Sequence, residues 1–204
     1  MKQIKKLLNL TKPLILASKS PRRNKLLKNL GFDFEVIPSE FKEDKQDFNS
    51  NYKEYVKYSA YKKAEDVAKR TGKPALILGA DTIVVLNNQI LHKPKDEEDA
   101  FRILKTLSGN THIVYTGIAL IDTENNKNIT DVQATEVTFR ELDDDEIQAY
   151  IETGSPMDKA GAYGIQDDFG AVFVSHINGC YYNIVGLPLE LLYTSMKKLL
   201  KIVR

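Results

Sequence analysis

The chain has 204 residues, of which 42% are hydrophobic and 28% are charged, and its formal net charge is +1. This composition is ordinary for a globular protein and excludes disordered and collagen-like chains. The small net charge argues against a protein that binds nucleic acid through its bulk charge. No apolar run approaches the ~20 residues needed to cross a membrane. The single cysteine, Cys180, excludes an internal disulfide framework and a cysteine-rich zinc site, which fits a cytoplasmic location.

Residues 1–12 are basic, and their leucines are too few and too interrupted for the apolar core of a secretory signal. We interpret this segment as a leading helical turn or N-terminal extension. The remaining residues, 13–204, contain no internal repeat, low-complexity tract or flexible linker. We therefore expect a single α/β domain over 13–204.

Short apolar runs alternate with segments of helical period, which is typical of an α/β fold. Residues 75–86 form a run rich in isoleucine and valine, which predicts a central strand buried on both faces. In chain order, the first half predicts a strand at 14–18, a helix at 21–30, a strand at 34–37, a helix at 51–70 and this strand at 75–86.

The second half follows a tight turn expected at Asn87-Asn88. Together with the first half it predicts a mixed, twisted sheet flanked by helices, arranged in two lobes. In chain order, the second half predicts a helix at 96–107, a long antiparallel pair at 111–121 and 129–139, a helix at 143–152 started by a capping box, a hairpin of 171–177 with 181–185, and a C-terminal helix at 188–202.

The segment SKSPRR, residues 18–23, lies between an expected strand and an expected helix. Ser20 is a suitable N-cap and Pro21 a suitable first helical residue. Backbone N–H groups at a helix start bind anions, and Arg22 and Arg23 add charge-assisted donors for phosphate. The segment therefore suggests a phosphate site; the alternative is a capped helix with two solvated arginines.

Asp81 lies in the segment GADT, inside the most apolar strand of the chain. A carboxylate there is costly unless it is paired or binds a metal, so Asp81 is a functional candidate. The alternative is a bulge that brings Asp81 to the strand edge. Lys93 follows the expected turn and could return a cation to the same cleft, although alone it is typical of a surface lysine.

The segment GSPMDKAGAYGIQ, residues 154–166, is rich in glycine, which lets a backbone approach a ligand closely. Lys159 precedes small residues that could wrap a phosphate chain. Gln166 offers a donor and an acceptor, as recognition of a base requires. The alternative interpretation is a flexible loop.

Three acidic residues, Glu40, Glu43 and Asp44, follow the second strand. A hard cation such as Mg²⁺ binds one or two carboxylates plus substrate phosphates, although such acids are also common in solvated loops. Two other groups are interpreted as structural. They are the histidines at 92, 112 and 176, which lack metal-ligand spacing, and the tyrosines at 52, 55, 58 and 61, which recur every three residues along a helix.

Six segments, in this order, resemble the Maf family of nucleoside triphosphate pyrophosphatases, which is related to the inosine-triphosphate pyrophosphatases. The resemblance spans roughly residues 13–195. The segments are LILASKSPRR (14–23), GADTIVVL (79–86), LHKPKDEEDA (91–100), LSGNTHIVYTG (107–117), YIETGSPMDKAGAYGIQ (150–166) and NIVGLPL (183–189).

The resemblance implies an α/β fold with an elongated mixed sheet and a cleft between two lobes. It also implies hydrolysis of a nucleoside triphosphate to the monophosphate and pyrophosphate, with a divalent metal cation, Mg²⁺ or Mn²⁺. A homodimer is a further expectation from the family. No nucleic acid or membrane is implied as a partner.

Carried over by motif, Asp81 corresponds to the catalytic acid that activates water, and with Glu43 it corresponds to the metal-binding acids. The family's basic positions near the phosphates correspond to Arg22, Arg23, Lys63, Lys93 and Lys159, beside Ser18 and Ser20 of the turn. Positions tied to substrate choice correspond to Arg22, Thr82 and Gln166. The family branch that acts on dTTP and UTP carries GIQ, as residues 164–166 do here, so these two nucleotides are the expected substrates, with modified pyrimidine nucleotides as a further expectation.

Three features depart from the family pattern. The residues after Gln166, Asp167 to Gly170, are about one longer than the commoner GIQ-G-x-G, which affects the expected base specificity. Lys42 stands where many relatives have an acid, which affects the expected metal site. Residues 1–12 have no counterpart in shorter members.

Two other functions are alternatives to hydrolysis. The family's older name refers to arrest of septum formation, so a nucleotide-sensing regulator of division without turnover is one alternative. A transferase of a sugar phosphate or nucleotidyl group is the other, and it predicts a transferred product instead of free monophosphate.

Overall fold

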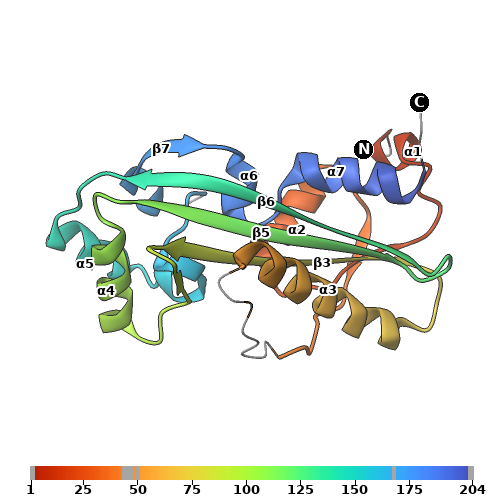
Figure 1. Cartoon of the computed structure of the whole chain (residues 1–204), viewed down its shortest axis with the longest axis horizontal. Helices are drawn as coiled ribbons and strands as arrows, with labels where there is room; N and C mark the ends of the chain where they lie inside the picture. The colour runs from red at the N-terminus through yellow and green to blue at the C-terminus, as the bar shows by residue number, and fades with distance from the viewer. Residues whose placement is uncertain (1–2, 43–47, 49–50, 167–168, 202–204) are drawn as a thin grey trace. The chain divides into compact units, whose positions relative to one another are not determined.

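The structure is a computed structural model that describes residues 3–42, 48, 51–166 and 169–201 (Figure 1). It is a mixed α/β fold with a seven-stranded sheet in the order β2-β1-β3-β5-β6-β7, and β4 pairs with β3. The strands are β1 (Leu14–Leu16), β2 (Phe34–Val36), β3 (Leu76–Leu86), β4 (Gln89–Leu91), β5 (Thr111–Asp122), β6 (Lys127–Phe139) and β7 (Val174–Asn178). The helices are α1 (Gln3–Leu7), α2 (Pro21–Asn29), α3 (Tyr52–Thr71), α4 (Glu97–Leu107), α5 (Asp144–Glu152), α6 (Tyr181–Val185) and α7 (Leu189–Leu199), with short 3₁₀ turns at Ser155–Asp158, Ala160–Ala162 and Phe169–Phe173.

The sheet contains both strand orientations, as the sequence predicted. β1 is parallel to β2 and β3, while β4 is antiparallel to β3 and β7 is antiparallel to β6. The chain forms two compact units. The first consists of the chain up to Asp81, Thr116–Gln133 and the part from Gly186 onward, and the second consists of Thr82–Tyr115 and Ala134–Val185. The two units are described separately below.

In the first unit, α3 packs closely on β3 and β5. Asn51 caps its start by accepting a hydrogen bond from the N–H of Glu54, and Gly72 ends it in the left-handed region. A Cβ on Gly79 of β3 would lie 2.2 Å from the Ala60 carbonyl oxygen, and one on Gly117 of β5 would lie 2.3 Å from that of Val56. The two glycines therefore let the helix backbone contact the strands directly.

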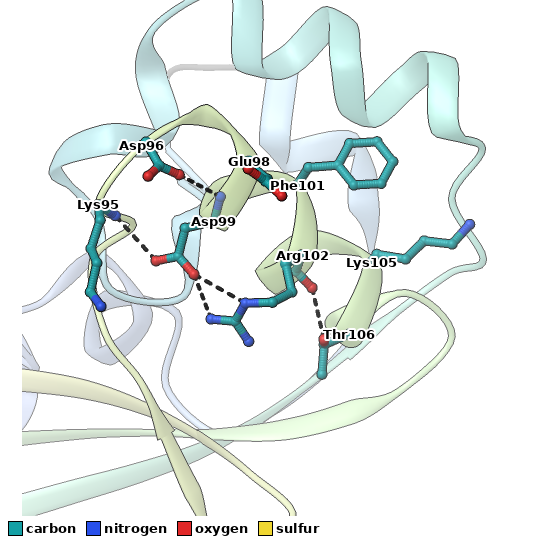
Figure 2. A pocket seen from close by; sticks show the side chains of 8 residues that line it. All are labelled: Lys95, Asp96, Glu98, Asp99, Phe101, Arg102, Lys105 and Thr106. Atoms are coloured by element: carbon teal, nitrogen blue, oxygen red, sulfur yellow. Dashed lines mark hydrogen bonds and ion pairs between the residues drawn. The ribbon is translucent and has the colours of Figure 1, made fainter.

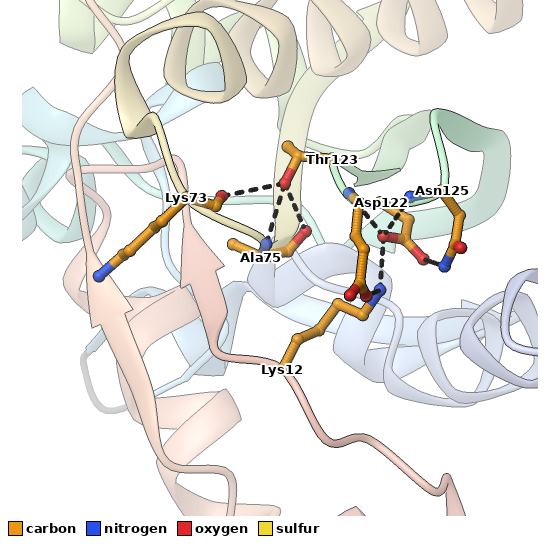
Figure 3. A network of polar contacts seen from close by, with 7 residues as sticks. Lys12, Lys73, Ala75, Asp122, Thr123 and Asn125 are labelled. Atoms are coloured by element: carbon orange, nitrogen blue, oxygen red, sulfur yellow. Dashed lines mark hydrogen bonds and ion pairs between the residues drawn. The ribbon is translucent and has the colours of Figure 1, made fainter.

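The residues before β1 are part of the first unit. Leu8 is fully buried, and Lys12 forms ion pairs with Asp122 at 2.7 Å and with Glu124 at 2.6 Å (Figure 3). Burial raises the pKa of Asp122, but hydrogen bonds from Lys12 and Asn125 outweigh it and hold that pKa below its usual value. The expected helical turn is confirmed as α1, and the segment that follows it is anchored by charge as well as by burial.

In the second unit, a hydrophobic core lies among β3, β5, β6, α4 and α5. Asn87 and Asn88 both adopt positive φ between β3 and β4, which confirms the tight turn. Asp143 and Glu146 form the capping box of α5. Glu146 also accepts two hydrogen bonds from Arg140, and these lower its pKa to about 2.

The expected strand at 181–185 is wrong, because these residues form α6. The strand at 174–178 pairs with β6 instead of forming a hairpin with them. Asn183 is fully buried and donates hydrogen bonds to the Val114 carbonyl and to Thr135 Oγ1. These tertiary contacts satisfy the buried Nδ2 of an amide within a helical turn, which the short apolar run could not reveal.

Candidate active site

The turn between β1 and α2 forms a closed hydrogen-bonded cluster. The Ser20 hydroxyl accepts from the N–H of Arg23 at 3.4 Å, which confirms the N-cap. The buried Ser18 hydroxyl accepts from the N–H of Ser20 and from Arg23 Nη1, both at 3.2 Å, and Arg23 Nε donates to the Gly186 carbonyl at 2.8 Å. The Arg23 guanidinium is thus fixed in orientation against the turn. Arg22, the next residue back along α2, is half-buried.

Asp81 lies in an unbroken part of β3 and is only 6% exposed, so the alternative of an exposed strand edge is wrong. Its carboxylate forms an ion pair with Lys63 of α3 at 2.6 Å. Because side chains alternate along a strand, Ile77, Gly79 and Asp81 face the same side, toward α3. The contact of α3 with Gly79 therefore holds Lys63 close to the aspartate.

The turn at residues 18–20 begins where β1 ends, and Asp81 lies further along the neighbouring strand β3. Leu16 of β1 pairs in parallel with Leu78 of β3, and the N–H of Ala17 donates to the Leu78 carbonyl. Beyond this point β1 ends and its chain enters the turn at Ser18, while β3 continues to Asp81. The carboxyl ends of parallel strands are the usual place for ligand sites in open α/β sheets.

The remaining candidates belong to the second unit. The glycine-rich segment has a defined structure instead of being a flexible loop, since the N–H of Gly161 donates to the His92 carbonyl at 3.3 Å. This bond joins the segment to the exposed Lys93 next to His92. Lys159 is held by Ser155 and Asp158, with hydrogen bonds to the Ser155 hydroxyl at 2.9 Å and the Asp158 carboxylate at 2.8 Å. Thr82, which follows Asp81 in β3, is half-buried.

The Oε1 atom of Gln166 is one of several buried polar atoms that have no hydrogen-bond partner among the described residues. A buried acceptor without a partner is costly, so such an atom in a polar segment is a candidate for contact with a ligand.

The expected acidic residues give a partial picture. Glu43 and Asp44 lie outside the described residues, whereas Glu40 is exposed and its N–H donates to Asp66. Within the described residues, no group of three or more His, Cys, Asp or Glu side chains could hold a metal ion. Asp81 nevertheless fits a hard cation, because such ions can bind a single protein carboxylate plus substrate phosphates.

The side chains interpreted as structural differ in burial: His92 and His176 are exposed, whereas His112 is buried and the four tyrosines are half-buried. His112 is buried and its Nε2 lies 2.8 Å from the Tyr163 hydroxyl, and burial lowers its pKa from 6.5 to about 4. Tyr55 and Tyr58 contact the ring of Phe48 with centroids 5.5 and 5.4 Å apart, so they pack as expected. Sequence reasoning missed the role of Tyr150, which is fully buried and hydrogen-bonded to Gly164. In the sequence, this role was indicated only in that Tyr150 begins YIETGSPMDKAGAYGIQ, one of the segments that resemble the family.

A hollow of about 680 Å³ lies along α4, and none of the candidate residues lines it (Figure 2). Several of its charged groups have partners: Asp99 accepts from Arg102 and from the N–H of Lys95, and Lys105 pairs with Asp144 at 2.6 Å. It therefore contributes no argument for a ligand site.

The chain is similar in sequence to one known family and to named relatives. The model of the family described as "Maf-like protein" matches residues 13–199. The chain is 51% identical over 183 residues, 90% of its length and 95% of the relative's, to a dTTP/UTP pyrophosphatase of Clostridium perfringens. It is 50% identical over 185 residues, 91% and 98% of the two chains, to a dTTP/UTP pyrophosphatase of Clostridium beijerinckii. A solved HAM1 protein from Coxiella burnetii aligns with 63% of this chain and 73% of its own, at 20% identity and a TM-score of 0.42.

No helix within the described residues is long and apolar enough to cross a membrane.

Proposed function

Because the chain belongs to the Maf family, we propose that it hydrolyses dTTP and UTP to the nucleoside monophosphate and pyrophosphate. The observation that carries the proposal is the buried Asp81, whose carboxylate pairs with Lys63. Asp81 lies on β3, and β3 pairs in parallel with β1, the strand that leads into the turn at residues 18–20. The names of relatives about 50% identical over nine-tenths of the chain support the same reaction. A cytoplasmic location is part of this proposal.

Hydrolysis of a phosphoanhydride depends mainly on positioning and on neutralising charge. The capped start of α2 supplies the positive end of the helix dipole and the Arg22 side chain, while the Arg23 side chain is held by Ser18 and Gly186. This turn is the proposed binding site for the triphosphate. Lys93 and Lys159 are the proposed cations that offset charge on the departing pyrophosphate.

Asp81 is the proposed general base. Its carboxylate accepts a proton from water as the water oxygen attacks the α-phosphorus, and the bond to pyrophosphate breaks. The ammonium of Lys63, 2.6 Å away, fixes the orientation of the carboxylate. A divalent cation at this carboxylate, with Glu43 as the proposed second ligand, would supply further charge neutralisation on the phosphate oxygens.

Gln166 is the proposed reader of the base, and Thr82 and Arg22 are further proposed contributors to substrate choice. The N3 position of uracil and thymine is a hydrogen-bond donor, whereas that of cytosine is an acceptor. The unpartnered Oε1 of Gln166 suits the N3 donor, which cytosine does not offer.

The test is a turnover panel of dTTP, UTP, CTP, 7-methyl-GTP and inosine triphosphate with Mg²⁺ or Mn²⁺. We expect dTTP and UTP to give monophosphate and pyrophosphate in equal amounts, and the other nucleotides to react more slowly. Binding of dTTP without turnover would instead favour a nucleotide-sensing regulator. A product carrying a transferred group would favour a transferase.

A further inference from the structure

Tyr150 lies in the core of the second unit, on α5, and is fully buried. Its ring packs edge-on against Phe173, with centroids 5.2 Å apart, and against Phe169 at 6.3 Å. Phenylalanine would provide the same aromatic packing. The choice of tyrosine therefore requires a role for the hydroxyl, since a buried phenol needs a hydrogen-bond partner.

The hydroxyl of Tyr150 contacts the chain on both sides of Gln166. Before Gln166, the N–H of Gly164 donates to the hydroxyl at 3.0 Å. After it, Gly170 is so close that a Cβ there would lie 2.9 Å from the hydroxyl oxygen and 2.8 Å from the Gly164 carbonyl oxygen. The two glycines thus close around a single side-chain atom.

We propose that Tyr150 is a positioning residue for Gln166 and thereby for the choice of pyrimidine base. Its hydroxyl fixes the backbone at Gly164, two residues before the glutamine whose buried Oε1 has no partner in the part of the chain that the structure describes. A single unpartnered acceptor can select a base only if its position is fixed. This inference rests on the proposed function of Gln166.

Tyr163 offers a matched comparison. It is also buried and is even closer to Gly164 in sequence, but its hydroxyl lies 2.8 Å from the His112 ring and not on the loop backbone. Removing either hydroxyl leaves an aromatic ring of the same shape in the same core. Only Tyr150→Phe removes the partner of the Gly164 N–H.

The experiment measures kcat and KM for UTP and CTP in the wild type, Tyr150→Phe and Tyr163→Phe. We expect the preference for UTP over CTP in kcat/KM to fall about fivefold in Tyr150→Phe, mainly through KM for UTP, as suits the loss of one hydrogen bond. In Tyr163→Phe the preference should stay within about twofold of the wild type, since the free energy of one hydrogen bond at Gly164 is retained. Equal losses in both variants, or an unchanged preference in Tyr150→Phe, would overturn the inference.

Amide hydrogen exchange at Gly164 in the ligand-free protein separates this inference from the proposed function. If the wild type hydrolyses neither dTTP nor UTP, the proposed function fails by itself. Faster exchange at Gly164 in Tyr150→Phe than in Tyr163→Phe would still support the anchor, and equal exchange would refute it.

A second variant approaches the same hydroxyl from the other side. Gly170→Ala places a methyl group against the Tyr150 hydroxyl and the Gly164 carbonyl, so it should displace the same backbone. We expect it to lower the UTP preference as Tyr150→Phe does. A folded Gly170→Ala protein with the wild-type preference and wild-type exchange at Gly164 would count against the anchor.

Discussion

The Lys63–Asp81 pair and Gln166 are both largely enclosed, but their polar groups are satisfied differently. The carboxylate of Asp81 has an ammonium 2.6 Å away, whereas the Oε1 of Gln166 has no hydrogen-bond partner within the described ranges of the chain. A group that moves a proton benefits from a fixed partner that sets its orientation. A group that recognises a ligand is more selective when only the correct ligand satisfies it. The difference separates the proposed reacting group from the proposed reading group, and substitutions at Asp81, Gly79 and Gln166 test it.

The largest expected effect follows Asp81→Asn, which removes the proposed base but keeps the side-chain shape. We expect kcat for dTTP to fall by roughly 10²–10⁴, the usual contribution of a general base. Pyrophosphate release measures the rate, and circular dichroism shows that the fold is retained. Asp122→Asn is the matched control, because Asp122 is another buried strand aspartate that pairs with a lysine. This variant should lower the stability of the protein but keep kcat within about twofold, because Asp122 has no proposed role in the reaction. Near-normal turnover in a folded Asp81→Asn protein would remove Asp81 from its role.

Gly79→Ala tests whether the close approach of α3 holds the lysine–aspartate pair. The new Cβ would lie 2.2 Å from the Ala60 carbonyl oxygen and 2.9 Å from the Ala64 nitrogen, so the helix must move. We expect a loss of roughly 1–3 kcal/mol in the free energy of unfolding, measured by urea titration, together with a lower kcat.

The control for this change is Gly72→Ala at the end of the same helix. Gly72 has open space around it but a positive φ, so alanine there strains the cap by about 1 kcal/mol without moving Lys63. Equal activity of the two variants would show that the Gly79 contact does not position the pair.

His112 tests how the core of the second unit depends on a neutral imidazole. Burial lowers the pKa of His112 from 6.5 to about 4, so between these values the unfolded state binds more protons than the folded state. Stability therefore rises as pH increases through this window, by about 2 kcal/mol between pH 4.5 and pH 7. Urea titrations at several pH values should show this slope in the wild type and a weaker slope in His112→Gln. Identical slopes in the two proteins would show that another group is responsible.

The smallest effect is expected for Gln166→Ala, which removes the unpartnered acceptor. We expect the preference for UTP over CTP to fall about tenfold, with kcat for UTP changed much less, because one hydrogen bond to the base is lost. Steady-state kinetics with both nucleotides measure the ratio. An unchanged ratio would assign base selection to other residues.

Local sequence patterns predicted most of the helices and strands, because each pattern depends only on residues that are close together in the chain. Ser20 with Pro21 marks the start of α2, and the capping box marks the start of α5. The run at 181–185 failed because five residues are too few to distinguish a strand from a helical turn. Its conformation is set by Asn183, which bonds to residues 69 and 48 positions away in the chain.

In the candidate site too, some residues could be predicted from the local sequence, whereas others depended on tertiary contacts. Asp81 could be singled out because a carboxylate in an apolar strand is costly, whatever its partner. Its partner lies 18 residues earlier and entered only through the family resemblance, because helix packing on Gly79 creates the contact. The hydroxyl of Tyr150 could not be distinguished from ordinary core packing, since its bond to Gly164 depends on the path of the chain.

The ion pairs of Lys12 have a consequence for how the protein is shortened or compared with its relatives. The family match begins at Pro13, one residue after this lysine, so a chain trimmed to the shared region would lose both its ion pairs and the buried Leu8. Asp122 and Glu124 would then lose the positive charge of Lys12, which pairs with both carboxylates. Residues 3–12 thus help to stabilise the β5–β6 connection. Replacing them with a segment that lacks Lys12 would require replacing Asp122 and Glu124 as well.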